Sequence, residues 1–348
     1  MKNKYINIFS EKNVINIAAI FLATMMTGSV IADEDKANEY NTGSFSISLD
    51  NDAFLGTDRG YTNGVFFKYN SDTTTEINNE SPFVLKTIGN FLALDEQSNK
   101  GWGVTIGQQI WTPVDISAPT ESAHDRPYTG LLFIEGTVFE YTKDFANKYS
   151  LMFGGVGPDT FGEDSQTFVH SLIGSTQPEG WGRQIKNQTI YNLGYEGQRL
   201  LTRDSAWFNT DYDAGLSGRA NIGNYQSELA VGSTFRWGQS LDESFASVGS
   251  MPGHYIDTSV LSKSRSGQFY YLAVEGRYRF QDITIDGARP KHLFDVHTEH
   301  WQATVSTGVV YYQASWGMAL SVITSTPDYE EDLRDYNSTA SVNVFWRA

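Results

Sequence analysis

The chain has 348 residues, a formal net charge of −16 and no cysteine. The acidic balance argues against nucleic acid as a partner, because its phosphates would be repelled. The absence of cysteine excludes a disulfide framework and thiolate chemistry. Aromatic residues make up 14% of the chain and there are 32 glycines, a composition that is typical of an outer-membrane β-barrel.

The N-terminus has the layout of a secretory signal peptide. Lysines near the start are followed by an apolar stretch, and the small residues Val30 and Ala32 fit cleavage before Asp33. The apolar stretch is shorter than the roughly 20 residues that a membrane-spanning helix needs. We therefore predict a signal peptide at 1–32 and one exported β-barrel domain at 33–348.

Alternation of apolar and polar residues predicts about twelve strands. It is clearest in Tyr271–Phe280, where Leu272 and Val274 share one face and Glu275 and Arg277 the other. The charged set would be costly against lipid, so we expect it to point into the lumen. The predicted strands are 43–51, 61–71, 101–111, 128–142, 148–157, 187–201, 204–218, 225–238, 268–282, 297–313, 314–326 and 336–346.

Strand length and aromatic placement favour a transmembrane barrel over a soluble β-sandwich. The predicted strands run to roughly 10 to 15 residues, whereas globular strands have about 5 or 6. Aromatic residues gather at strand ends, as at Tyr311 and Trp346, which is consistent with interfacial girdles. Between strands we predict a helix over about 164–173 and tight turns at 201–203 and 220–221. The fold class is thus all-β, an antiparallel barrel with short helical insertions in its loops.

A concentration of oxygen ligands follows the first predicted strand. Asp50, Asn51 and Asp52 end that strand, and the segment 57–64, which includes Thr62, opens the next. Carboxylate, amide and hydroxyl oxygens are ligands that Ca²⁺ prefers. An ordinary polar turn is the alternative interpretation.

His170 is a candidate general base, because histidine commonly exchanges protons near neutral pH. Gln166 lies four residues earlier, on the same face if the segment is helical. A structural or exposed histidine is the alternative. A further candidate, Arg126, precedes Pro127 at a strand start and can contact anionic phosphates.

Taken together, these segments resemble the outer-membrane lipid A 3′-O-deacylases of the LpxR type. The resemblance implies a twelve-stranded barrel in the Gram-negative outer membrane, with a Ca²⁺-dependent site on the lipid-facing wall and lipid A or lipopolysaccharide as substrate. We expect the protein to act as a monomer. The resembling segments, in chain order, are 48–52, 57–64, 124–130, 157–159, His170 and 181–185.

The resemblance also implies roles for individual residues. Asp52 would be the Ca²⁺ ligand, and Asn51, Thr62 and His170 the catalytic residues. By that interpretation His170 deprotonates a water, the water attacks an ester carbonyl, and Ca²⁺ stabilises the oxyanion. The product would be lipid A without its 3′-acyloxyacyl group.

The sequence departs from the family at one position. The family site includes a lysine between the third and fourth strands, whereas residues 113–125 contain no Lys or Arg. Arg126 or a lysine from elsewhere would supply the charge, or the chemistry is altered. Two other functions stay open: an outer-membrane phospholipase, for which Ser171 beside His170 is the candidate nucleophile, and a non-enzymatic pore or structural barrel.

Overall fold

The computed structural model describes residues 41–347 apart from 56–59, 76–82, 84–85, 88–90, 93, 121–123 and 290–293. The predicted signal peptide, 1–32, lies outside the described residues, as do residues 57–59 of the polar segment that opens the second strand. None of the helices in the described part of the chain has the length and apolar character needed to cross a bilayer.

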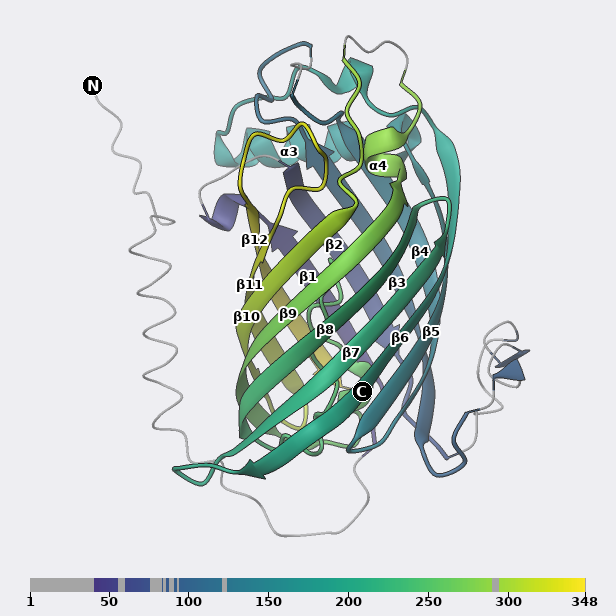
Figure 1. Cartoon of the computed structure of the whole chain (residues 1–348), viewed down its shortest axis with the longest axis vertical. Coiled ribbons are helices and arrows are strands. Elements are labelled where there is room, and N and C mark those ends of the chain that lie inside the picture. The colour runs from purple at the N-terminus through teal and green to yellow at the C-terminus, as the bar shows by residue number, and fades with distance from the viewer. Residues whose placement is uncertain are drawn as a thin grey trace.

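Antiparallel strands form a closed barrel (Figure 1). They are β1 (Ser44–Asn51), β2 (Gly60–Asn70), β3 (Asn99–Thr112), β4 (Thr129–Tyr141), β5 (Phe145–Val156), β6 (Gln188–Ser205), β7 (Asp211–Gly223), β8 (Gln226–Gln239), β9 (Gly267–Asp282), β10 (Trp301–Tyr312), β11 (Trp316–Ser325) and β12 (Asn337–Arg347). Each strand pairs with the next, and β12 closes the barrel against β1. The prediction of an antiparallel barrel of about twelve strands is confirmed.

Helices occupy the connections between strands. In the described part of the chain these include the α-helices α3 (Gly162–Ile173) and α4 (Ile283–Asp286) and the short 3-10 helices η1 (Ala53–Leu55), η2 (Pro158–Thr160), η3 (Trp181–Arg183) and η4 (Ser259–Leu261). The helix predicted over about 164–173 is confirmed as α3. Both α-helices lie at the same end of the barrel (Figure 1).

The seventh predicted strand was placed too early. We predicted a strand at 204–218 and tight turns at 201–203 and 220–221, but all of 201–203 lies in β6 and both 220 and 221 lie in β7. A register shift between Leu200 and Thr202 marks a β-bulge. A bulge inserts an extra residue without ending the strand, so the break in alternation there was misinterpreted as a turn.

The alternation of side chains across the wall is as predicted. On β9, Leu272 and Val274 are exposed on the outside, whereas Glu275 and Arg279 are buried on the lumen side. An outward apolar face continues round the barrel at positions such as Ile106. Outward apolar and inward polar residues are the pattern of a barrel that crosses a membrane.

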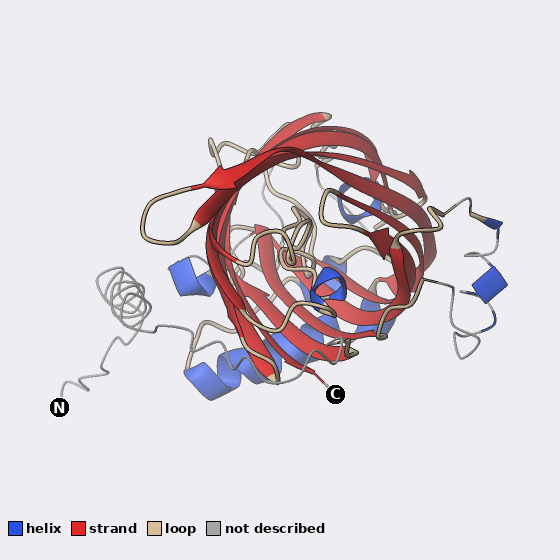
Figure 2. Ribbon diagram, turned by 90° about the horizontal axis from the view of Figure 1, so that it is seen from below, coloured by secondary structure: helices blue, strands red, loops and turns tan. Residues whose placement is uncertain are grey.

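The connection 240–266, which we call the plug, runs from β8 to β9 and fills part of the lumen. Its Leu241, Val248 and Ile256 pack in one apolar cluster with Phe269 of β9 and Tyr312 of β10. Seen along the barrel, loop segments cross the interior of the strand ring (Figure 2). The sequence indicated only a polar connection here, because a Gly- and Ser-rich stretch with scattered apolar residues is typical of loops.

Candidate active site on the outer wall

The β5–β6 connection brings α3 against the outside of the barrel. The carbonyl of Thr160, just before α3, accepts a hydrogen bond from Gln108 Nε2 of β3 at 2.6 Å. Gln108 lies on the same strand face as the exposed Ile106, so this contact is on the outer side of the wall. The helix therefore covers the outer surface of β3 and β4.

Two glycines allow a close approach between α3 and the wall. A Cβ on Gly162 would lie 3.1 Å from the Cα of Gly130 on β4 and 2.9 Å from the ring of Trp181. Trp181 packs with Tyr128, Ile110 and Ile116 in a separate apolar cluster, in which the Trp181 and Tyr128 ring centroids are 4.8 Å apart. We call these four residues the outer cluster, and it fixes η3 and the β3–β4 connection beside α3.

The α3 helix turns two polar side chains toward the barrel and exposes a mixture of apolar and polar ones on its other side. Gly162, Gln166 and His170 are buried and spaced four apart, which places them on one helix face. Phe168 and Leu172, in contrast, are 63% and 70% exposed. A helix on a water-facing surface usually buries its apolar residues, whereas this helix exposes two large ones and buries Gln166 and His170.

His170 is held in one tautomer. Its side chain is buried, and Nδ1 lies 2.5 Å from the carbonyl oxygen of Thr176. A carbonyl only accepts hydrogen bonds, so Nδ1 carries the proton and Nε2 is the nitrogen that can accept one. The chain reaches this position because Gly174 ends α3 in the left-handed conformation, with a φ of 70°.

Gln166 is fixed one helical turn before His170. Its Oε1 accepts the indole N–H of Trp181 at 2.9 Å, and an indole can only donate, so the amide orientation is determined. The amide Nε2 is buried and has no hydrogen-bond partner among the described residues. Buried polar atoms are nearly always satisfied, so this donor indicates a place for a ligand acceptor.

Asn51, Asp52 and Thr62 meet where β1 joins β2. Asn51 lies opposite Asn63 in the strand pairing, and its Oδ1 accepts the backbone N–H of Ala53 at 2.7 Å. Asp52 is only 1% exposed, and its backbone N–H donates to the carbonyl of Thr62 at 3.4 Å. The hairpin thus gathers one carboxylate, one amide and one hydroxyl.

Thr62 faces outward because of a second β-bulge. The pairing of β2 with β3 shifts between Tyr61 and Asn63, which leaves Thr62 as the extra residue. Its hydroxyl lies 2.8 Å from that of Thr112, which follows Ile110 on the outer face of β3. Bulges commonly re-aim a side chain beside a functional site. Asn51 and Thr62 thus lie on the outer side of strands that neighbour the α3 contact.

The donor set at the hairpin fits a hard cation. Asp52 offers a carboxylate oxygen, Asn51 an amide oxygen and Thr62 a hydroxyl oxygen. Ca²⁺ takes oxygen ligands of these three kinds. A role for Asp52 in holding Ca²⁺ stays a prediction that this chemistry favours.

Arg126 does not join the other predicted residues. Its guanidinium is fully buried on the lumen side, where it binds Asp328 and donates to Thr284 Oγ1 at 3.0 Å. It also lies over the Trp111 ring, 5.5 Å from the centroid. These partners occupy it inside the barrel, so a substrate-binding role stays a prediction that its position does not favour. The connection that holds α3 carries Arg183 of η3, next to the outer cluster, and Lys186.

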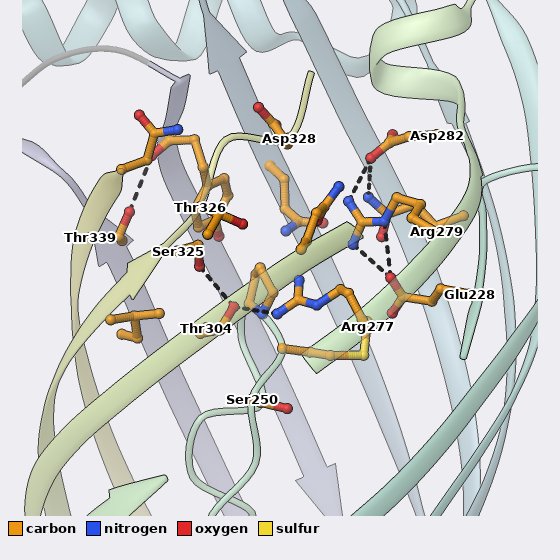
Figure 3. A pocket seen from close by; sticks show the side chains of 18 of the residues that line it. Glu228, Ser250, Arg277, Arg279, Asp282, Thr304, Ser325, Thr326, Asp328 and Thr339 are labelled. Atoms are coloured by element: carbon orange, nitrogen blue, oxygen red, sulfur yellow. Dashed lines mark hydrogen bonds and ion pairs between the residues drawn. The ribbon is translucent and has the colours of Figure 1, made fainter. Parts of the chain in front are cut away.

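A cavity of about 120 Å³ lies on the lumen side instead (Figure 3). Arg277 and Thr304 point into it, Ser250 of the plug lies at its lower edge, and Asp282 and Asp328 lie near its upper edge in this view. None of Asn51, Asp52, Thr62 and His170 lines it. The lumen cavity and the outer-wall residues are therefore separate features.

A scan of protein families gives one decisive match. The family model described as outer membrane protein LpxR matches residues 17–348. The chain belongs to the LpxR family of outer-membrane proteins. The family predicted from the sequence is thereby confirmed, and so is the outer-membrane location.

One solved structure agrees on the fold of this LpxR family member, and others are less similar. LpxR from Salmonella typhimurium matches with a TM-score of 0.73 and 18% identity, over 87% of this chain and 99% of that chain. The β domain of the Bordetella autotransporter BrkA has a TM-score of 0.40 and 8% identity, over 88% and 98% of the two chains. A search of curated proteins found no match.

The outer-membrane location explains the surface next to α3. Ile106 pairs with Ile134 and both are half-exposed on the outside. They lie two residues from the Gln108–Leu132 pair, and Gln108 holds the start of α3, so the apolar band begins about 7 Å from that level. The polar residues Gln166 and His170 of α3 therefore lie next to a surface that contacts lipid.

Proposed function

We propose that this LpxR family protein is a Ca²⁺-dependent hydrolase that removes the 3′-acyloxyacyl group of lipid A. The observation that carries the proposal is His170, a buried base of fixed tautomer on the wall-facing side of a helix that exposes Phe168 and Leu172 on its other side. An ester at the boundary between sugar and acyl chains matches a site whose polar residues lie beside an apolar band. Family membership supports the same substrate.

His170 acts as the general base. Its Nε2 takes a proton from a water molecule as the water oxygen attacks the ester carbonyl carbon. The resulting imidazolium is stabilised by the hydrogen bond from Nδ1 to the Thr176 carbonyl. When the tetrahedral intermediate collapses, the carbon–oxygen bond to the sugar breaks and the proton passes from Nε2 to the leaving alkoxide. The products are a free acyloxyacyl acid and a lipid A hydroxyl.

Gln166 and the β1–β2 hairpin assist the same step. The Gln166 Nε2 donor stabilises the negative charge that develops on the carbonyl oxygen. Asp52 would hold Ca²⁺ with help from Asn51 and Thr62, and a bound Ca²⁺ would supply Lewis-acid polarisation of the carbonyl. Phe168 and Leu172 contact acyl chains on the outer side of α3.

The two other functions have less support. Ser171, the candidate nucleophile of a phospholipase, is exposed and donates its hydroxyl hydrogen to the Thr167 carbonyl at 2.8 Å. It follows His170 directly in α3, so the two side chains point in different directions and do not form a nucleophile and base pair. An open pore is disfavoured by the plug, which packs against lumen residues of β9 and β10.

The test is mass spectrometry of lipid A after incubation with the purified full-length barrel in detergent, with Ca²⁺ or with a chelator. We expect loss of one acyloxyacyl mass with Ca²⁺, and intact lipid A with the chelator or with Asp52→Asn. Asp115→Asn, in an exposed loop, is the matched control and should behave as the wild type. Intact lipid A in the presence of Ca²⁺ would contradict the proposal.

A further inference from the structure

The polar motifs around the first hairpin are divided between the two sides of the barrel wall. Asn51 and Thr62 face outward, but Asp50 and Tyr61, which directly precede them, face the lumen. We propose that Asp50 and Tyr61 form, with the tip of the plug, a positioning brace that holds the outer residues in register. This inference rests on the proposed function, since it assigns the brace to the same site.

Asp50 is the centre of the brace. It is fully buried, and its Oδ2 accepts two hydrogen bonds, from the Tyr61 hydroxyl at 2.9 Å and from the backbone N–H of Gly253 at 2.9 Å. Those bonds join β1, β2 and the plug at one carboxylate oxygen. Hydrogen bonds to a charged group are stronger than neutral ones, so this is a stiff point in the wall.

Tyr61 reaches Asp50 because of the local sequence. The bulge at Thr62 lets Tyr61 and Thr62 point to opposite sides of the wall at the point where the pairing shifts. Gly64 lies opposite Asp50 in the pairing, and a Cβ there would overlap the Tyr61 hydroxyl and lie 2.7 Å from the Phe66 ring. Gly64 therefore makes room for the tyrosine that crosses toward Asp50.

The plug tip fits this place closely. Gly253 has a φ of 70°, in the left-handed region, and a Cβ on it would clash with the ring of Phe66 on β2. The next residue, His254, lies with Nδ1 3.1 Å from Nζ of Lys68, also on β2. The tip is thus located against β2 by packing and by polar contacts.

The brace has a direct consequence for the outer site. Asp50 is bonded one residue before Asn51 and two before Asp52, and Tyr61 one residue before Thr62. Moving either inner side chain shifts the backbone that carries the proposed Ca²⁺ ligands. None of Asp50, Tyr61 and Gly253 has a place in the proton transfer, so they are positioning residues rather than catalytic ones.

The experiment measures Ca²⁺ binding by calorimetry and by Tb³⁺ luminescence on the full-length barrel in detergent. Asp50→Ala, Tyr61→Phe and Gly253→Ala should each weaken binding about tenfold, the size of a lost buried hydrogen bond. They should also lower kcat with little change in KM, because they do not touch the lipid. Asp50→Asn, which retains an acceptor oxygen, should recover most of the affinity.

The matched control variants also change lumen-side hydrogen bonds of β1 and the plug, but at residues that do not belong to the brace. Ser48→Ala, on the same strand as Asp50, removes a buried lumen-side hydrogen bond from Asn343 of β12. Ser250→Ala removes the bond from the plug to Glu275. Both should bind Ca²⁺ as the wild type does. Tyr61→Phe keeps the ring and is the variant least prone to misfold, and folding is checked by heat-modifiable migration on gels.

The possible failures are distinguishable. Wild-type affinity in all three brace variants, together with loss of binding in Asp52→Asn, would overturn the brace and leave the proposed function standing. Absence of Ca²⁺ binding by the wild type would overturn both. Equal weakening in the two controls and the brace variants would also overturn the brace, because the effect would then be general loosening of the barrel.

Discussion

The lumen side of the wall and its outer side near α3 both bury polar groups, but they satisfy them differently. In the lumen, Arg279 lies 2.7 Å from Glu228 and 2.8 Å from Asp282, and Arg236 lies 2.6 Å from Asp213. On the outer side the buried site residues are Thr62, Gln166 and His170, which offer a hydroxyl, an amide and an imidazole.

This difference distinguishes the polar groups that stabilise the barrel from those that we propose act in the reaction. A closed set of ion pairs has its charges compensated from within the protein, which is what a buried charge requires. The outer group is held by backbone contacts and by Trp181, and it presents the Gln166 amide donor with no protein acceptor among the described residues. The lumen pairs stabilise the barrel, whereas we propose that the outer residues bind a ligand.

The largest expected effect is on catalysis. His170→Asn should lower deacylation about a thousandfold, because general base catalysis contributes between about 10² and 10⁴, while the unfolding transition stays where it is. The rate of acyloxyacyl release per folded protein measures this. Retained activity in His170→Asn would assign the base to another residue.

The second-largest expected effect is on stability, and it tests the role of the lumen ion pairs. Asp213→Ala leaves Arg236, which is 2% exposed, without its carboxylate, and should cost about 3 to 5 kcal/mol of unfolding free energy. Urea unfolding of the barrel in detergent measures the loss. Asp242→Ala, from the exposed pair with Lys143, is the control and should cost less than about 1 kcal/mol.

If Asp213→Ala lowered the deacylation rate per folded molecule, the two sides of the wall would not be functionally separate.

Gln166→Leu should lower kcat by about a hundredfold, as for loss of one oxyanion donor. The change also removes the acceptor for the Trp181 indole, so Gln166→Glu, which keeps an acceptor and loses the donor, is the companion variant. Single-turnover rates of both variants measure the effect. If Gln166→Glu were as active as the wild type, the amide donor would have no part in the reaction.

The smallest effect concerns the loops that carry His297 and Glu331. The hydrogen bond between His297 Nδ1 and Glu331 Oε1, 2.7 Å, raises the pKa of His297 above its usual 6.5. Burial of Glu331 acts to raise the pKa of its carboxyl group. Hydrogen bonds from His297 outweigh this effect and hold that pKa below its usual 4.5. The ion pair between His297 and Glu331 is therefore fully present between about pH 4.5 and 6.5. It weakens as pH rises through the His297 pKa or falls through the Glu331 pKa.

Limited proteolysis of the β11–β12 connection checks this prediction. Cleavage should be faster at pH 8.5 than at pH 5.5 in the wild type, and His297→Ala should remove most of that difference. The same pH dependence in the variant would show that another group controls the loop.

Periodicity made most of the fold predictable, because one face of every strand meets lipid and the other the lumen. The α3 helix was predictable too, from Gln166 and His170 at a spacing of four. The plug was not, because its apolar contacts with Phe269 and Tyr312 are made across the lumen and leave no period in 240–266.

The candidate site was predictable by residue type but not by direction. Asp50, Asn51 and Asp52 are consecutive oxygen ligands in the sequence, and only the pairing reveals that Asp50 faces the lumen. Bulges at Leu201 and Thr62 shift the alternation without any composition signal. Arg126 faces the lumen because its partners, Thr284 and Asp328, lie there. Both partners come from connections that are distant in the sequence, so a local pattern cannot indicate this direction.

The measurement that tests the central claim most directly is hydrolysis of lipid A by the purified barrel in ¹⁸O-labelled water with Ca²⁺. We predict one ¹⁸O atom in the released acyloxyacyl acid, none in the lipid A hydroxyl, and no release by His170→Asn. Release without label, label in the sugar hydroxyl, or equal release by His170→Asn would contradict a water activated by His170 that attacks the ester carbonyl.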